Sequence, residues 1–304
     1  MFLKTLFKNL KFLCKNNLWD LKSTSEWANI EYIPETRKIR LFKEMQQNKF
    51  VSLKANILSY EDSIEYIIKN RCSLCRFGDG EFNIINGGDI PYQKYNPLLS
   101  KRLREILMSC FEPSANERNI KIAIGREYYD FSDWNNLIFP KFFEDYIMLN
   151  EDKLVSFCSE NYEYLATAMS HLYNTFKEYD FSSYFEHIKE IWEKRDIVII
   201  CGERSFKNIS YNIFDCAKSI EYLYAPTENA FDQYDEILDR AKAISKDKLI
   251  IAILGPTAKL IAWDLYALGY QAIDFGHIAK DYNSYIKKDP RNLETIHRFI
   301  CIDD

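Results

Sequence analysis

The chain has 304 residues, of which 47% are hydrophobic and 28% are charged, so it can bury a sizeable core in one large domain or two modest ones. Its net charge of −5 argues against a nucleic-acid partner, because general nucleic-acid binders carry a basic surplus. Eight cysteines are scattered, mostly in apolar runs, which indicates reduced, buried thiols and a cytoplasmic protein. No run is apolar over the ~18 residues that a membrane-spanning helix requires.

Residues 1–19 predict a basic amphipathic helix, which begins an extension and connector covering residues 1–53. Lysines interrupt the apolar core that a signal peptide would need. Two interpretations remain open: attachment to an anionic surface at the inner face of a membrane, or packing against the chain's own domain or a second chain. The apolar face comprises Phe2, Leu3, Leu6, Phe7, Leu10 and Leu13, and the basic face Lys4, Lys8, Lys11 and Lys15.

Strand and helix patterns alternate from residue 54 to residue 286, and residues 287–304 form a C-terminal extension. Ser59 is expected to cap the first helix of this domain, followed by acidic residues in its first turn. The alternation predicts an α/β, Rossmann-like fold with a mainly parallel sheet and helices on both faces. Strands are expected at 72–77, 120–124, 154–158, 196–201, 219–225, 248–254 and 270–275, and helices at 97–110, 133–149, 162–177, 183–194, 232–245 and 257–268.

Charged residues begin where the first long strand ends, in the sequence RFGDGEF. Asp79 and Glu81 are two residues apart in an expected turn, where an extended backbone would point both carboxylates the same way. Paired carboxylates suit Mn²⁺ or Mg²⁺, and Gly78 leaves room for a ligand. The alternative is a solvated turn or an ion pair with Arg76. The neighbouring Cys72-x-x-Cys75 pair has no second pair downstream, which favours a structural role over zinc or redox chemistry.

A second candidate site follows the strand at 248–254, where Gly255 and Pro256 turn the chain into a helix that starts near Thr257. The start of a helix favours phosphate, although many such turns bind nothing. The P-loop pattern and the G-x-G-x-x-G fingerprint are both missing. His277 follows the last expected strand and is either a structural residue or a ligand. If the sheet order brings these strand ends together, Asp79, Glu81, Thr257 and His277 converge.

These stretches together resemble the GT-D-type glycosyltransferases, a bacterial family first catalogued as a domain of unknown function. The resemblance covers about residues 59–283 and rests on RFGDGEF with YQKY, NAFDQYDEIL and LGPTAKLIAWDLYALGYQAIDFGHI. It implies a Rossmann-like fold, a nucleotide-sugar donor such as UDP-glucose, and a divalent metal held by Asp79 and Glu81, the expected catalytic pair. The expected substrate-binding residues are Arg76, Gly78, Gly255, Pro256, Thr257 and His277.

Two stretches depart from the family pattern. Phe206 replaces an arginine, Tyr211 and Asn212 stand where Asn-Asp is usual, and SENY replaces an Arg-Pro-Tyr stretch. The resulting hypothesis is a metal-dependent glycosyltransferase that uses a UDP-sugar and acts on a surface glycan, glycolipid or glycoprotein, including a lipid-linked acceptor. The alternatives are a non-catalytic, membrane-associated nucleotide-sugar-binding or scaffold protein of the same fold, and a phosphotransferase.

Overall fold

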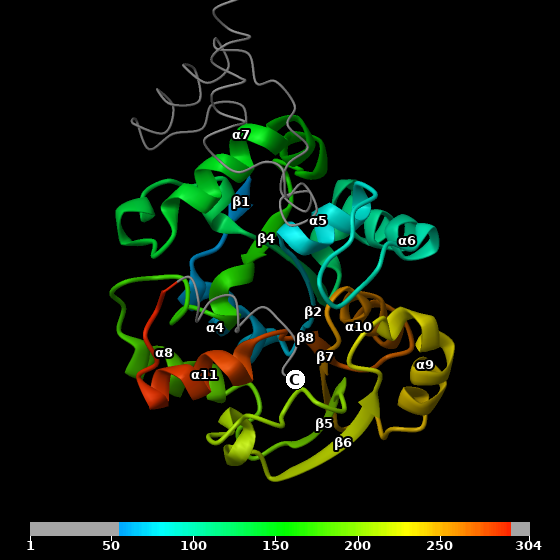
Figure 1. Cartoon of the computed structure of the whole chain (residues 1–304). Helices are drawn as coiled ribbons and strands as arrows, with labels where there is room; N and C mark the ends of the chain where they lie inside the picture. Colours follow the sequence, from blue (N-terminus) through cyan, green and yellow to red (C-terminus); the bar gives the residue numbers. More distant parts are fainter. Residues whose placement is uncertain (1–54, 293–304) are drawn as a thin grey trace, which may run out of the picture.

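The computed structural model describes residues 55–292. The expected amphipathic segment of residues 1–19 and the connector up to residue 53 therefore lie outside the described residues, as do residues 293–304. In the described range, every strand pairing within one eight-stranded sheet is parallel, in the order β1-β4-β3-β2-β8-β7-β5-β6 (Figure 1). The strands are β1 (Asn56–Ile57), β2 (Ser73–Phe77), β3 (Ile120–Ile124), β4 (Glu163–Ala166), β5 (Asp196–Gly202), β6 (Ser219–Ala225), β7 (Leu249–Ile253) and β8 (Ala272–Asp274).

Helices cover both faces of this sheet, as the alternating pattern predicted. One face carries α4, α8 and α11, and the other carries α5, α6, α7, α9 and α10 (Figure 1). The helices are α4 (Tyr60–Asn70), α5 (Asp79–Ile85), α6 (Pro97–Met108), α7 (Pro140–Phe157), α8 (Phe181–Lys189), α9 (Tyr234–Lys242), α10 (Pro256–Ala267) and α11 (Ile278–Lys287), with short 3₁₀ turns between some of them.

The central strands read as continuous apolar runs because both of their faces are buried. Along β5, Ile197 and Ile199 pack into the core under α4, α8 and α11, whereas Val198 and Ile200 pack into the core on the other face. Successive side chains of a strand point to opposite faces, so a strand covered on both sides needs apolar residues at every position. The parallel Rossmann-like prediction is confirmed.

The start of α4 also follows the sequence prediction. The Ser59 hydroxyl accepts a hydrogen bond from the Asp62 N–H at 3.0 Å, and Glu61 and Asp62 occupy the first turn. An oxygen acceptor satisfies a free N–H there, and acidic side chains are stabilised by the positive end of the helix dipole.

Two predicted elements between β3 and β5 are wrong. The expected strand at 154–158 is the end of α7, in which Ile147, Glu151 and Leu154 are buried at helical spacing. A short apolar run fits either structure, and periodicity alone does not separate them. The expected helix at 162–177 begins instead as β4, because Leu165 pairs with Ala123 of β3, and it continues as a 3₁₀ turn over Thr167–Ser170.

The chain leaves the carboxyl ends of β2 and β8 toward opposite faces. After β2 it enters α5, whose Phe82 packs in one core, and after the adjacent β8 it enters α11, whose Ile278 packs in the other. Such a divergence opens a crevice at the carboxyl edge of a doubly wound sheet, where ligands bind. Within residues 55–292, none of the helices is both long and apolar enough to cross a bilayer.

Candidate active site at the carboxyl edge

The order of the sheet brings the predicted site residues to one edge. Strand β8 lies between β2 and β7, and all three run parallel. The segments that follow them carry Asp79 and Glu81, His277, and the turn that begins at Gly255. The expected convergence of these strand ends is therefore confirmed.

The predicted extended turn around Asp79 and Glu81 is wrong, because these residues form the first turn of α5. Residues two apart on a helix point about 200° apart, so the carboxylates do not lie side by side as they would on an extended strand. Glu81 turns back, and its Oε2 accepts a hydrogen bond from the Gly78 N–H at 2.9 Å. The glycine before Asp79 thus starts a helix.

A buried set of alternating charges lies beneath this helix start. The Lys259 Nζ of α10 is 2.6 Å from Glu81 Oε1 and 3.1 Å from Asp274 Oδ2. Asp274 also pairs with Arg76, whose Nη2 lies 3.1 Å from Asp274 Oδ1. Burial alone would raise the pKa of Asp274, but the charges of Arg76 and Lys259 outweigh burial and lower it.

Arg76 is held on several sides. Its Nε donates to the Asp274 carbonyl at 2.9 Å and its Nη1 to Ser170 Oγ at 2.5 Å, and only 6% of the residue is exposed. Gly276 makes room for it: this residue has φ +42°, and a Cβ there would lie 1.9 Å from Arg76 Nη2. Arg76 therefore joins β2 to β8 and to the 3₁₀ turn at Thr167–Ser170, and its predicted contact with substrate stays a prediction.

Asp79 differs from its neighbours because it forms no ion pair within residues 55–292. Burial, and then the charge of Glu81, raise the pKa of Asp79 to about 6. Three tyrosines lie close enough to respond to the two carboxylates: burial raises the pKa of Tyr92, Tyr128 and Tyr146, and the charge of Asp79 contributes for each. Their hydroxyls consequently stay protonated at neutral pH.

The start of α10 is covered in this structure. Gly255 has φ +52°, and a Cβ there would lie 2.4 Å from the ring of Tyr92, so only glycine allows this close approach. Pro256 occupies the first helical turn, which suits its fixed φ. Thr257 is fully buried, and its hydroxyl has no hydrogen-bond partner in the described part of the chain. The predicted phosphate contact of Thr257 stays a prediction.

Two histidines lie near Arg76. His277 precedes α11, and burial followed by the charge of Lys280 and the proximity of His171 lowers its pKa well below the usual value. Burial, and then Arg76, lower the pKa of His171 to about 3. The Nδ1 of His171 is 3.1 Å from Ser170 Oγ. Both imidazoles are neutral at pH 7, so either ring can donate and accept one hydrogen bond.

Sequence reasoning missed Lys259, Ser170 and His171 at this edge. Lys259 carried a usable signal, because it interrupts an apolar helix and a buried lysine needs a partner. Ser170 and His171 carried none, since they were placed inside a helix that does not exist.

The cysteine pair beside β2 has a structural role. Cys72 and Cys75 are fully buried free thiols, and burial raises the pKa of Cys72 to about 12 and that of Cys75 as well. Metal binding and redox exchange require the thiolate, which these positions disfavour. Among residues 55–292, no group of three or more His, Cys, Asp or Glu side chains is arranged to hold a metal ion.

The residues that depart from the expected motif are used locally. Phe206 packs edge-on against Tyr222 with ring centroids 5.5 Å apart. Asn212 Oδ1 accepts from the Phe214 N–H at 3.1 Å and so caps a 3₁₀ turn. The Tyr211 side chain is 48% exposed.

Fold and site together define a doubly wound α/β protein with carboxylates gathered at the switch point of its sheet. The chain belongs to the GT-D-fold glycosyltransferase family, whose model, described as "Glycosyltransferase GT-D fold", matches residues 74–300.

Curated relatives and solved structures agree with this family. The chain is 30% identical over 248 residues to the "Probable glycosyl transferase Gly" of Streptococcus gordonii, covering 80% of this chain and 35% of the relative. It is 31% identical over 223 residues to the "Glycosyltransferase GlyD" of Streptococcus pneumoniae serotype 4, covering 73% of this chain and 26% of the relative. The chain thus spans about a third or less of these relatives' length.

Two solved structures share the fold, and the match covers most of each of those chains. One, described as "The highly conserved domain of unknown function 1792 has a distinct glycosyltransferase fold", gives a TM-score of 0.72 at 33% identity over 82% of this chain and 86% of the other. The second, described as "A New Glycosyltransferase (DUF1792) from Streptococcus sanguinis", gives a TM-score of 0.71 at 27% identity, over 83% of this chain and 95% of the other.

Proposed function

We propose that this chain is a metal-dependent glycosyltransferase that moves a sugar from a nucleotide-diphosphate donor, a UDP-sugar, to a hydroxyl of a surface glycan, glycolipid or glycoprotein. One observation carries the proposal. Within residues 55–292, Asp79 forms no ion pair, whereas the neighbouring cations Arg76 and Lys259 are already paired with Asp274 and Glu81. A diphosphate at this edge therefore needs positive charge from elsewhere.

The residues present fit a divalent cation at Asp79. Burial, and then the charge of Glu81, raise the pKa of Asp79 to about 6 and so disfavour its carboxylate form, which a bound cation would stabilise. Glu81 has both oxygens occupied, by Lys259 and by the Gly78 N–H. Asp79 is thus the proposed direct ligand. Glu81 would stay paired with Lys259 and attract the cation through its charge without contacting it. When bound, Mn²⁺ or Mg²⁺ would neutralise the diphosphate leaving group.

The chain's own residues would position the donor. Glu81 and Lys259 fix the start of α5 against α10, so that Asp79 keeps one position at the end of β2. The turn at Gly255 follows β7 and the neutral His277 follows β8, and these would supply backbone and imidazole groups for hydrogen bonds. Tyr92 lies over Gly255 and would have to move before a phosphate reaches the start of α10.

The metal proposal is tested by calorimetric titration of Mn²⁺ in the presence of UDP. We expect Asp79→Asn to abolish Mn²⁺ binding, because the direct ligand is lost. Glu81→Gln should weaken binding and also lower the melting temperature, since Lys259 loses a partner. Asp239→Asn is the matched control on the exposed surface of α9, where Asp239 pairs with Lys242. Wild-type affinity in Asp79→Asn would rule out this residue as the ligand.

Transfer itself needs a separate measurement. With UDP-sugar labelled in the sugar or in the β-phosphate, a glycosyltransferase releases or transfers the sugar label and leaves UDP intact. Transfer of the phosphate label would indicate a phosphotransferase. Tight donor binding without any turnover, in the presence of Mn²⁺ and a panel of acceptors, would instead favour the non-catalytic alternative, for which the altered Phe206 and Tyr211 positions are the motive.

A further inference from the structure

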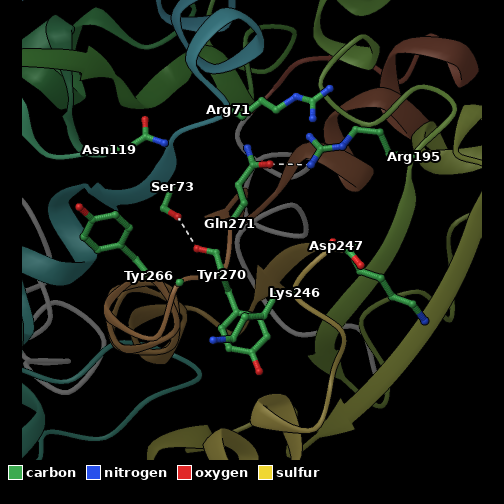
Figure 2. A pocket seen from close by; sticks show the side chains of 11 residues that line it. Arg71, Ser73, Asn119, Arg195, Lys246, Asp247, Tyr266, Tyr270 and Gln271 are labelled. Atoms are coloured by element: carbon green, nitrogen blue, oxygen red, sulfur yellow. Dashed lines mark hydrogen bonds between the residues drawn. The ribbon is translucent and has the colours of Figure 1, made fainter.

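A cavity of about 420 Å³ lies at the amino edge of the sheet, opposite the candidate active site. Most of its lining residues immediately precede or begin β2, β5, β7 or β8, whereas Asp79, Gly255 and His277 follow the other ends of β2, β7 and β8. Figure 2 shows the side chains that line it. The charged and amide groups that matter below are Arg71, Arg195, Lys246, Asp247, Lys248 and Gln271.

Positive charge dominates this cavity. Four basic side chains and one carboxylate line it, in a protein whose net charge is −5. Lys248 is paired with Glu221, outside the cavity. Arg71 forms no ion pair with any residue between 55 and 292. In the part of the chain that the structure describes, Arg195 donates to two neutral groups, the Ile191 carbonyl at 3.0 Å and Gln271 Oε1 at 2.6 Å.

The two guanidinium groups stand on the same side of the cavity (Figure 2). The two groups also lie close enough to interact electrostatically, because burial, and then the charge of Arg71, lower the pKa of Arg195. Like charges repel, so two guanidiniums held together without a carboxylate form a site that a bound anion stabilises.

The framework under these groups is fixed. Arg71 ends α4 in the left-handed conformation with φ +47°, which turns the chain into β2. Gln271 Nε2 donates to the Cys72 carbonyl at 3.2 Å, and so ties β8 to the start of β2 while its oxygen holds Arg195. Lys246 lies over the Tyr270 ring, 5.3 Å from its centroid. The cations therefore project from ordered strand ends.

We propose that this cavity binds a small, soluble anion bearing a phosphate group, with Arg71 and Arg195 as its principal ligands. A planar guanidinium matches phosphate oxygens in a bidentate manner, and two of them suit a dianion. The volume is that of a small-molecule site. Because the donor site is at the opposite edge, this ligand is distinct from the nucleotide-sugar, and the inference does not depend on the proposed function.

The test is calorimetric titration of inorganic phosphate into the full chain, without metal or nucleotide, at an ionic strength held constant with KCl. We expect saturable binding at one site, weakened about tenfold or more by Arg71→Ala and by Arg195→Gln, since each removes a charge-assisted contact. Lys69→Ala is the matched control: it removes an exposed positive charge two residues from Arg71, outside the cavity. Its affinity should change less than twofold.

Arg71 is exposed, so Arg71→Ala keeps the test valid even if Arg195→Gln fails to fold. A second arm with glucose 1-phosphate distinguishes free phosphate from a phosphate ester, and either one binding through Arg71 supports the site. Absence of saturable binding, or equal losses in Arg71→Ala and Lys69→Ala, would each overturn the proposal.

Discussion

Lys259 lies within the apolar helix α10, and only 3% of the residue is exposed. Removing an ammonium from water costs several kcal/mol, and the cost is offset only when opposite charges and hydrogen bonds surround it. Glu81 and Asp274 provide the charges, and the Gly255 carbonyl accepts from Nζ at 3.1 Å. The same lysine thus anchors the start of α5, the end of β8 and the glycine turn.

Replacing Lys259 should therefore expose the cost of the carboxylates it leaves behind. We expect Lys259→Met to lower the free energy of unfolding by about 3–5 kcal/mol, measured by urea denaturation. Adding Glu81→Gln should restore part of the loss, because Glu81 is the carboxylate left without a cation, whereas Asp274 keeps its pair with Arg76. Lys101→Met, at an exposed site on α6, should change stability by less than about 0.5 kcal/mol. A Lys259→Met protein as stable as wild type would contradict this network.

His171 links stability to pH. Its folded pKa of about 3 lies below the ordinary value of 6.5, so the unfolded chain takes up a proton that the folded protein refuses. Stability from this group is complete above pH 6.5 and is lost as the pH falls from 6.5 toward 3. Between pH 7 and pH 5, the free energy of unfolding measured by urea denaturation should fall by about 1–2 kcal/mol less in His171→Gln than in wild type. Parallel pH profiles for the two proteins would refute this assignment.

At the scale of elements, the connection from β8 to α11 depends on one glycine. Gly276 follows Asp274 and Phe275, and its positive φ turns the chain while the guanidinium of Arg76 occupies the space beside its Cα. A side chain here would both strain the backbone and push Arg76 away from Asp274. The junction of β2, β8 and α11 consequently does not accommodate a residue larger than glycine at position 276.

We expect Gly276→Ala to lower the free energy of unfolding by about 3 kcal/mol or more, because backbone strain and a broken buried ion pair add. Gly87→Ala is the matched control: Gly87 also has a positive φ, of +94°, but no atom lies within 4 Å of the added Cβ. It should cost only about 1 kcal/mol, the penalty of the left-handed conformation. Equal losses measured in urea would show that contact with Arg76 is immaterial.

At the scale of the whole molecule, residues 1–19 bear on where the protein works, although they lie outside the described residues. Each lysine near an anionic surface contributes about 1 kcal/mol of attraction. A full-length variant with Lys4, Lys8, Lys11 and Lys15 changed to glutamate should stop sedimenting with anionic vesicles and keep its Mn²⁺ and UDP affinity. If the wild-type chain fails to sediment at low salt, packing of this segment on the protein itself becomes the better interpretation.

The sequence alone predicted most of the parallel sheet, because strands buried on both faces are written as apolar runs such as those of β5 and β7. It also located the capped start of α4 and the strand ends that carry Asp79, Gly255 and His277, because charged and glycine residues mark where buried strands stop. Each of these signals depends only on residues that are adjacent in the sequence.

Tertiary structure decided the rest. Glu163–Ala166 became β4 because β3 offered it a free edge, and an apolar run at the end of α7 stayed helical because its neighbours bury a helical face. The order of β2, β8 and β7 placed Lys259 between Glu81 and Asp274, residues separated by up to 193 positions in the chain. Pairing of charges over such distances depends on which strands become neighbours, a choice made by packing of the entire core and written in no single stretch of sequence.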